Sequence, residues 1–273
     1  MFHAFCLIHD DVMDNSTTRR GRDAVHRALA RHHAQGRSPT AADRLGTGAA
    51  ILLGDLALAW ADELLHSAGL RACQLGAALP LIESMRTEIM YGQHLGLITT
   101  GTPAEDLYRA LMIVRYKTAK YTCERPLQIG AALVGADAQL LEDLRAFGVP
   151  LGEAFQLRDD LLGAFGVPEE TGEPILDDLR EGKHTARLSL ALQRARPAQR
   201  GQLRRLFGHG RLSEEQACAV RGIITSTGAQ DAVETMIESL HRQALRALDT
   251  INPGPDTVGV LRRLADGAIW RQA

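Results

Sequence analysis

The 273-residue chain has few aromatic side chains, 4% of the total, and no excess of charge of either sign. Its 31 lysines and arginines are balanced by 33 aspartates and glutamates. Binding of nucleic acid through bulk charge needs surplus cations, because release of counterions from the phosphates drives it. The balance therefore argues against a nucleic-acid partner. The hydrophobic content of 45%, in turn, excludes a disordered chain, and the length suits one large domain.

Paired cysteines, a secretion signal and a long apolar run are also lacking. The cysteines, Cys6, Cys73, Cys123 and Cys218, form no CxxC pair, so we expect neither a zinc site nor a disulfide framework. The first residues reach two aspartates before any long apolar run, unlike a signal peptide. The most apolar stretch, 46–65, is interrupted by three acidic residues, so we expect no transmembrane segment. By elimination we expect a cytoplasmic protein.

Strand-forming patterns are nearly absent as well, whereas apolar residues recur at the helical spacing of three and four, as at 140, 141, 144 and 147. Turn-forming residues separate the segments, with Thr102 as an expected N-cap. Long helices with short connections predict an all-α bundle. The expected helices cover about residues 1–14, 23–34, 44–68, 70–98, 104–116, 119–134, 137–165, 184–195, 199–207, 213–226, 229–249 and 256–269.

Three carboxylates stand close together in the sequence DDVMD of residues 10–14. Asp10 and Asp14 are four residues apart and share one helical face, where like charges repel. Mg²⁺ would relieve the repulsion, because it prefers oxygen ligands and completes its shell with water and phosphate oxygens. Arg19 and Arg20 follow, and their guanidinium groups suit phosphate. The alternative is a solvated acidic turn with ordinary ion pairs.

A second acidic pair, Asp159 and Asp160, lies in a helical pattern otherwise rich in Leu, Phe and Ala. Buried unpaired charges are costly, so we expect a group that neutralises them. Gln156 lies three residues earlier on the same face, and Arg158 is expected to point outward or to form an ion pair. Lys117, Thr118 and Lys183 lie elsewhere in the chain, and each taken alone is more typical of a surface residue.

Five motifs occur in order: LIHDDVMDNSTTRRG, YGQ at 91–93, YKTAKY at 116–121, FQLRDDLLG at 155–163 and DDLREGK at 177–183. Together they resemble the trans-isoprenyl diphosphate synthases, also called polyprenyl synthetases, from residue 1 to about residue 190. The resemblance implies an all-α bundle of the isoprenoid-synthase type with a central cavity. It also implies a single domain over residues 1–273 and a homodimer.

The resemblance further implies three Mg²⁺ ions, held with an allylic diphosphate by two Asp-rich motifs. The implied metal ligands are Asp10, Asp11 and Asp14 in the first motif and Asp159 and Asp160 in the second. The implied contacts of the allylic diphosphate are Arg19, Lys117 and Lys183, and those of isopentenyl diphosphate are Arg20 and His3. The positions that match residues near the allylic carbon and its diphosphate are Gln93, Thr118 and Gln156. The expected catalytic residues are Lys117, Thr118, Gln156 and Lys183.

The implied reaction joins the allylic group to isopentenyl diphosphate and gives a longer all-trans polyprenyl diphosphate. Diphosphate leaves readily only when its growing charge is neutralised, which Mg²⁺ and fixed cations provide. In the family, bulky residues before the first motif limit product length. Here Phe5 and Cys6 hold that place, and one aromatic followed by a small residue favours geranylgeranyl over farnesyl diphosphate. The other interpretation is that Phe5 only packs in the core.

The sequence departs from the family pattern in several places. Members carry helices upstream of the first motif, including a Gly-Lys-Arg segment that binds isopentenyl diphosphate, whereas Met1 lies nine residues before Asp10. We therefore expect a fragment, a misassigned start or a reduced second-substrate site. Gly96 and Gly163 stand where many members have Asp, and Glu173 where many have Lys.

Two other functions remain open. A class I terpene cyclase would share the bundle and the first motif, but it usually needs a second, Asn-Ser-Glu type metal motif, and neither Asn15 nor Asn252 begins one. A catalytically impaired subunit that modulates a partner synthase would fit the short N-terminus, whereas the intact first motif argues against it.

Overall fold

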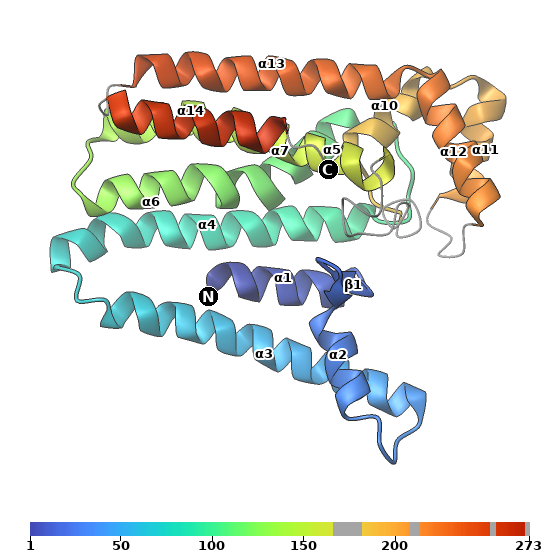
Figure 1. Cartoon of the computed structure of the whole chain (residues 1–273), viewed down its shortest axis with the longest axis horizontal. Helices are drawn as coiled ribbons and strands as arrows, with labels where there is room; N and C mark the ends of the chain where they lie inside the picture. Colours follow the sequence, from blue (N-terminus) through green and yellow to red (C-terminus); the bar gives the residue numbers. More distant parts are fainter. Residues whose placement is uncertain (166–181, 208–212, 252–254, 271–273) are drawn as a thin grey trace. The chain divides into compact units, whose positions relative to one another are not determined.

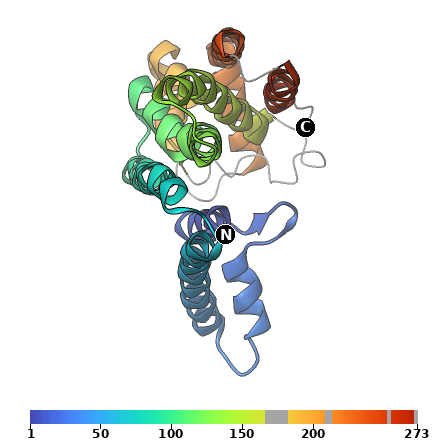
Figure 2. The ribbon, with the colours of Figure 1, turned by 90° about the vertical axis from the view of Figure 1, so that its left-hand side faces the viewer.

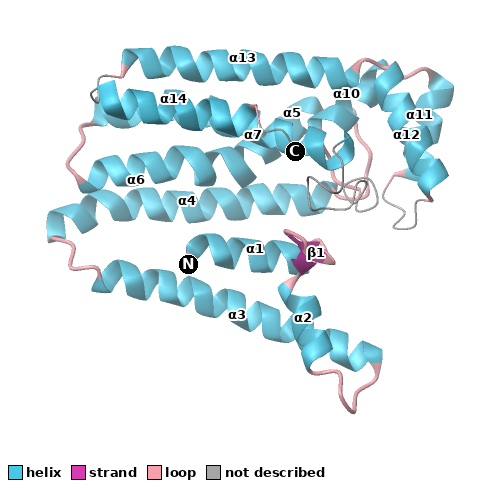
Figure 3. Cartoon of the chain, in the orientation of Figure 1, coloured by secondary structure: helices cyan, strands magenta, loops and turns pink. Residues whose placement is uncertain are grey.

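The computed structural model describes residues 1–165, 182–207, 213–251 and 255–270. Within these residues the chain is helical almost throughout, with one short hairpin (Figures 1 and 3). This confirms the all-α prediction. In the same part of the chain, no helix combines the length and the apolar character needed to cross a bilayer.

Contacts among the described residues divide the chain after Arg71 into two compact units. Unit 1 contains residues 1–71, and unit 2 contains the described residues from 72 onward. Each unit has its own helix packing and its own part of the predicted site. The single domain over residues 1–273 stays a prediction.

Unit 1 consists of α1 (Phe2–Met13), β1 (Thr18–Arg19), β2 (Arg22–Asp23), α2 (Val25–His32) and α3 (Pro39–Ser67). Figure 2 shows α2 lying alongside α3. They pack closely at Gly46 of α3, where a Cβ would lie 2.2 Å from the carbonyl oxygen of His26. The helix α3 begins at Pro39 with Ser38 as its N-cap, earlier than the expected residue 44, because proline suits the first helical turn.

The hairpin of β1 and β2 is a local exception to the helical pattern. Arg20 and Gly21 connect the strands, and both have positive φ angles, 53° and 71°. Positive φ at both central residues is the geometry of the turn that best matches the twist of a two-residue hairpin. The turn returns the chain along itself, so that Arg22 pairs with Arg19 and Asp23 pairs with Thr18.

Unit 2 contains the remaining helices. They are α4 (Ala72–Thr99), α5 (Leu107–Ile113), η1 (Val114–Glu124), α6 (Arg125–Leu133), α7 (Ala138–Phe165), α10 (Ala186–Arg194), α11 (Pro197–Leu206), α12 (Glu214–Ser226), α13 (Ala229–Thr250) and α14 (Pro255–Ile269). Their core joins α7, α10, α13 and α14 through fully buried side chains such as Leu157, Leu188, Ile237 and Ile269.

Two expectations about local structure in unit 2 are corrected. We expected a helix break between residues 116 and 119, but the chain stays helical through the π-helix η1, whose turns are wider than those of an α-helix. The N-cap of α5 is Asp106, whose carboxylate accepts from the backbone N–H of Arg109, and not Thr102. The acidic side chain is the better acceptor at this end of the helix.

Candidate functional site

The first acidic motif lies at the C-terminal end of α1 in unit 1. The carboxylate of Asp11 is buried and accepts a hydrogen bond of 2.9 Å from Nε of Arg19. The same guanidinium lies 3.4 Å from Oδ2 of Asp10. Asp14 is half-buried and is the C-cap residue of the helix. The hairpin thus places Arg19 as a counter-charge for two of the three acidic residues.

The residues predicted to contact isopentenyl diphosphate, His3 and Arg20, also lie in unit 1. Arg20 occupies the exposed turn of the hairpin. The pKa of His3 is lowered by partial burial of its ring and by the positive charge of Arg20. The imidazole of His3 is therefore neutral near pH 7 and can accept or donate a hydrogen bond.

The predicted chain-length residues lie one turn before the first motif. Phe5 is buried, and its ring packs against Phe2 at a centroid distance of 5.6 Å and against His9 at 4.8 Å. Burial, followed by the negative charge of Asp10, raises the pKa of the Cys6 thiol to about 12. Both side chains are therefore apolar groups, and their role in setting chain length stays a prediction.

The second acidic motif lies near the C-terminal end of α7 in unit 2. The hydroxyl of Thr118 donates to Oε1 of Gln156 at 2.7 Å, and Nε2 of Gln156 donates to Oδ1 of Asp160 at 2.8 Å. Asp159 is exposed, whereas Asp160 is half-buried. The relay orients one carboxylate of the pair and connects it to η1.

Two arginines fix this part of α7. Arg158 forms two parallel hydrogen bonds of 2.6 Å to Glu234 of α13, as expected for an ion-pairing residue. The fully buried Arg187 of α10 donates to the backbone carbonyl of Asp160 at 3.0 Å.

The other predicted residues of unit 2 lie on separate elements. Lys117 is half-buried in η1, and Gln93 is half-buried in α4. Gly92, the residue before Gln93, lies against the backbone of Lys117. Lys183 is half-buried in the turn before α10. The remainder of the fifth motif, and Glu173, lie outside the described residues.

An ion-pair network between α4, η1 and α6 was not predicted from the sequence. Lys120 of η1 lies 2.9 Å from Glu88 of α4 and 2.8 Å from the fully buried Glu124. Burial alone would raise the pKa of Glu88, but hydrogen bonds from Arg125 and Lys120 outweigh it and hold the pKa below its ordinary value. The spacing of Lys120 and Glu124, four residues apart, is the only local signal of this network.

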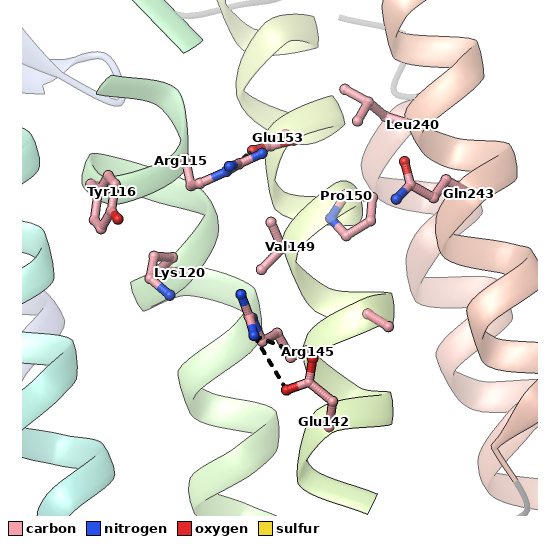
Figure 4. A pocket seen from close by; sticks show the side chains of 11 residues that line it. Arg115, Tyr116, Lys120, Glu142, Arg145, Val149, Pro150, Glu153, Leu240 and Gln243 are labelled. Atoms are coloured by element: carbon pink, nitrogen blue, oxygen red, sulfur yellow. Dashed lines mark hydrogen bonds and ion pairs between the residues drawn. The ribbon is translucent and has the colours of Figure 1, made fainter. Parts of the chain in front are cut away.

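A cavity of about 420 Å³ opens between η1, α7 and α13 (Figure 4). Its charged side chains are largely paired with each other, Arg115 with Glu153 and Arg145 with Glu142. None of the predicted site residues lines it, although Tyr116 of η1 precedes Lys117 directly. The cavity is therefore distinct from the predicted diphosphate site.

The acidic motifs fit Mg²⁺ through the chemistry of their donors. Asp10 and Asp14 lie one turn apart, and Asp159 and Asp160 are adjacent, so each motif offers at least two carboxylates as hard oxygen donors. Mg²⁺ commonly binds only one or two carboxylates and keeps water or phosphate oxygens as its remaining ligands. Among the described residues, no group of three or more His, Cys, Asp or Glu side chains is placed so that it could hold a metal ion.

A family model described as polyprenyl synthetase matches residues 1–224. The chain belongs to the polyprenyl synthetase family. This confirms the resemblance inferred from the five motifs. The chain is therefore a prenyl-transferring enzyme of the trans type.

Relatives of known structure or function support this membership. The geranylfarnesyl diphosphate synthase of Aeropyrum pernix is 32% identical over 236 residues, which are 85% of this chain and 68% of that enzyme. The farnesyl diphosphate synthase of Mycobacterium tuberculosis is 35% identical over 185 residues, which are 68% of this chain and 46% of that enzyme. The crystal structure of geranylgeranyl pyrophosphate synthase from Corynebacterium glutamicum, complexed with isoprenyl diphosphate and magnesium, has a TM-score of 0.94 and 39% sequence identity. That match covers 99% of this chain and 76% of the crystallised one.

Proposed function

We propose that this polyprenyl synthetase condenses an allylic diphosphate with isopentenyl diphosphate in a magnesium-dependent reaction. The observation that carries the proposal is the relay from Thr118 through Gln156 to Asp160. It joins an acidic motif suited to magnesium to the helix that bears Lys117. Departure of a diphosphate requires its growing charge to be neutralised, and a metal ion at this motif together with Lys117 would supply positive charge for it.

The two acidic motifs would hold the metal, with Asp10, Asp11 and Asp14 in one and Asp159 and Asp160 in the other. Magnesium, as three ions by the family resemblance, supplies positive charge that the leaving diphosphate needs. Binding of metal at the first motif would compete with Arg19 for Asp10 and Asp11. Arg19 would then be released to the diphosphate, as the resemblance implies.

The remaining side chains bind and orient the substrates. Lys117 and Lys183 would donate to the diphosphate of the allylic substrate, with Gln93 beside them. As the allylic carbon–oxygen bond breaks, the diphosphate leaves with the electron pair. The double bond of isopentenyl diphosphate then forms the new carbon–carbon bond, and the departing diphosphate takes the proton that is lost. Arg20 and His3 would bind the second diphosphate.

Geranylgeranyl diphosphate is the proposed product. Phe5 is buried before the first motif, while Cys6 behind it is small, so the growing chain meets one bulky side chain and not two. The crystallised enzyme from Corynebacterium glutamicum carries the same activity in its name. Farnesyl diphosphate is the second candidate.

A homodimer is proposed as the assembly, and the cytoplasm as its location. The support for the homodimer is an exposed apolar stripe on α3 of unit 1. Its side chains repeat at intervals of about one helical turn, and they are Leu52, Leu56, Trp60 and Leu64. Such a stripe is costly in water and is typical of a surface that a partner covers.

Asp10→Ala and Asp159→Ala test the proposal. Each removes a hard oxygen donor and should lower turnover of allylic and isopentenyl diphosphates by about two orders of magnitude or more, because charge on the leaving diphosphate is no longer neutralised. Asp249→Ala, on the exposed end of α13, is the control and should keep wild-type activity. Circular dichroism should show the same helix content in all of these proteins.

The products of the wild-type enzyme separate the remaining possibilities. A longer linear diphosphate supports prenyl transfer, and its length decides between the geranylgeranyl and farnesyl products. A cyclic hydrocarbon would contradict the proposal in favour of a terpene cyclase. No turnover alone, together with altered product length when a partner synthase is added, would identify a modulating subunit. Near-normal activity of either aspartate variant would refute the two-motif metal site.

A further inference from the structure

The helix that carries Lys117 and Thr118 has an unusual geometry. η1 is a π-helix over 11 residues, whereas π-helical geometry is normally confined to single turns within α-helices. Its wider turns place successive side chains differently from those of an α-helix. A segment of this kind needs support from its neighbours, and two of them approach its backbone unusually closely.

The first close approach is at Gly92 of α4. A Cβ at this position would lie 2.2 Å from the backbone nitrogen of Lys117 and 2.5 Å from the carbonyl carbon of Tyr116. Real Cβ atoms do not approach backbone atoms so closely, and backbone atoms cannot move aside as a flexible side chain can. Glycine at position 92 therefore allows α4 to lie directly against the backbone of the residue that is predicted to bind diphosphate.

The second close approach is at Gly152 of α7, the other helix that packs against η1. A Cβ there would lie 2.5 Å from Cα of the fully buried Ala119. Gly152, Gln156 and Asp160 are spaced four residues apart and so share one face of α7. Gly152 therefore meets η1 on the face of α7 from which Gln156 accepts the 2.7 Å hydrogen bond of Thr118.

Contacts of this kind are specific to a few glycines. Gly76 of α4 and Gly130 of α6 have no atom within 4 Å of a Cβ. Gly148 of α7 contacts the far end of η1, where a Cβ would lie 3.0 Å from Cα of Glu124. Gly92 and Gly152 thus differ from the others in meeting η1 at or next to Lys117 and Thr118.

We propose that Gly92 and Gly152 are positioning residues for the proposed prenyl transfer. They hold η1 between α4 and α7 at the depth where Lys117 meets the diphosphate and Thr118 reaches Gln156. This inference rests on the proposed function. It adds that two residues without side chains govern the site by setting the position of the helix backbone.

Alanine variants at these glycines test the inference. Gly92→Ala and Gly152→Ala should each lower kcat/KM by about tenfold to a hundredfold, since displacements of about 1 Å have effects of that size. Gly76→Ala, on the same helix as Gly92, is the matched control and should leave kcat/KM unchanged. Gly148→Ala should reduce thermal stability, because its methyl group would crowd Cα of Glu124. It should change kcat/KM by less than about twofold, because this contact lies at the other end of η1 from Lys117.

A double-mutant cycle distinguishes positioning from a general loss of stability. If Gly92 acts through Lys117, Gly92→Ala should change kcat/KM by less than about twofold in a Lys117→Ala background. The corresponding cycle pairs Gly152→Ala with Thr118→Val. Additive losses in both cycles would overturn the inference, as would wild-type kinetics in the folded single variants.

The outcomes also separate this inference from the proposed function. A wild-type protein that does not form a longer diphosphate contradicts the proposed function and the inference with it. An active wild type with unaffected Gly92→Ala and Gly152→Ala variants contradicts the inference alone. If neither alanine variant folds, the inference also fails, because the two glycines are then requirements of the fold and not of the site.

Discussion

At the residue scale, the carboxylate of Glu88 is paired with two cations, Arg125 and Lys120. Glu88 receives hydrogen bonds from Arg125 at 2.6 and 2.8 Å, and Lys120 lies 2.9 Å from it. These contacts lower the pKa of Glu88 in the folded state, whereas the unfolded chain has the ordinary value of about 4.5. The ionised carboxylate therefore stabilises the fold above the ordinary pKa, and this contribution is lost as pH falls through the folded pKa.

Glu88→Gln should lower the free energy of unfolding by about 1–3 kcal/mol near pH 7, because Lys120 and Arg125 each lose one of their two charged partners. The difference from wild type should shrink as the pH is lowered below about 4.5. Urea unfolding between pH 7 and pH 3 measures both effects. Glu83→Gln, at an exposed position of the same helix, is the control, and a pH-independent difference at Glu88 would contradict the assignment.

At the element scale, the helix α7 carries the second acidic motif and is tied to α13 by Arg158 and Glu234. The guanidinium is 13% exposed and the carboxylate 37%, so the pair lies partly out of solvent. Two parallel hydrogen bonds give such a pair a fixed geometry, in contrast to most surface ion pairs. The pair therefore holds α7 in place immediately before Asp159.

Glu234→Ala should reduce the free energy of unfolding by about 1–2 kcal/mol, since the half-buried Arg158 is left without its carboxylate. Glu238→Ala provides the same substitution one turn further along α13, where Glu238 and Arg242 form an exposed pair. It should cost no more than about 0.5 kcal/mol. Equal effects in chemical denaturation would show that the Arg158 pair contributes no more than a surface contact.

The sequence predicted most of the helices, but it did not predict η1 or the hairpin. The periodicity of apolar residues predicted the long helices α4, α7 and α13 almost to their ends. It did not predict η1, because the repeat of apolar residues does not distinguish a π-helix from an α-helix over a stretch this short. The hairpin before α2 was also missed, because its strands are only two residues long and carry no alternating apolar pattern.

At the scale of the whole molecule, the apolar stripe of α3 is the feature that bears on assembly. Leu52 and Leu64 are 70% and 58% exposed, and Trp60 is 43% exposed. Burial of apolar surface stabilises by roughly 25 cal/mol per Å², and this gain offsets the entropy that two copies lose on association. This is the physical basis for the proposed homodimer.

Leu52→Glu should convert the proposed dimer to a monomer, because a charge would be buried in the interface without a partner. Sedimentation velocity at micromolar concentration measures the change. Val134→Glu, which places the same charge at another exposed apolar position, should leave the dimer intact. A monomeric wild type, or a dimeric Leu52→Glu variant, would contradict the use of α3 as the interface.

The sequence by itself determined the helical class, the family and the identity of the acidic and basic residues, because these depend on periodicity and on residue types in a fixed order. Only the tertiary structure decided that Arg19 pairs with Asp10 and Asp11, that Gln156 connects Thr118 to Asp160, and that Lys120 lies beside Glu88. It also decided that η1 is a π-helix held against glycines. These features depend on how closely separate helices approach one another, and that distance is set by packing and not by any local pattern.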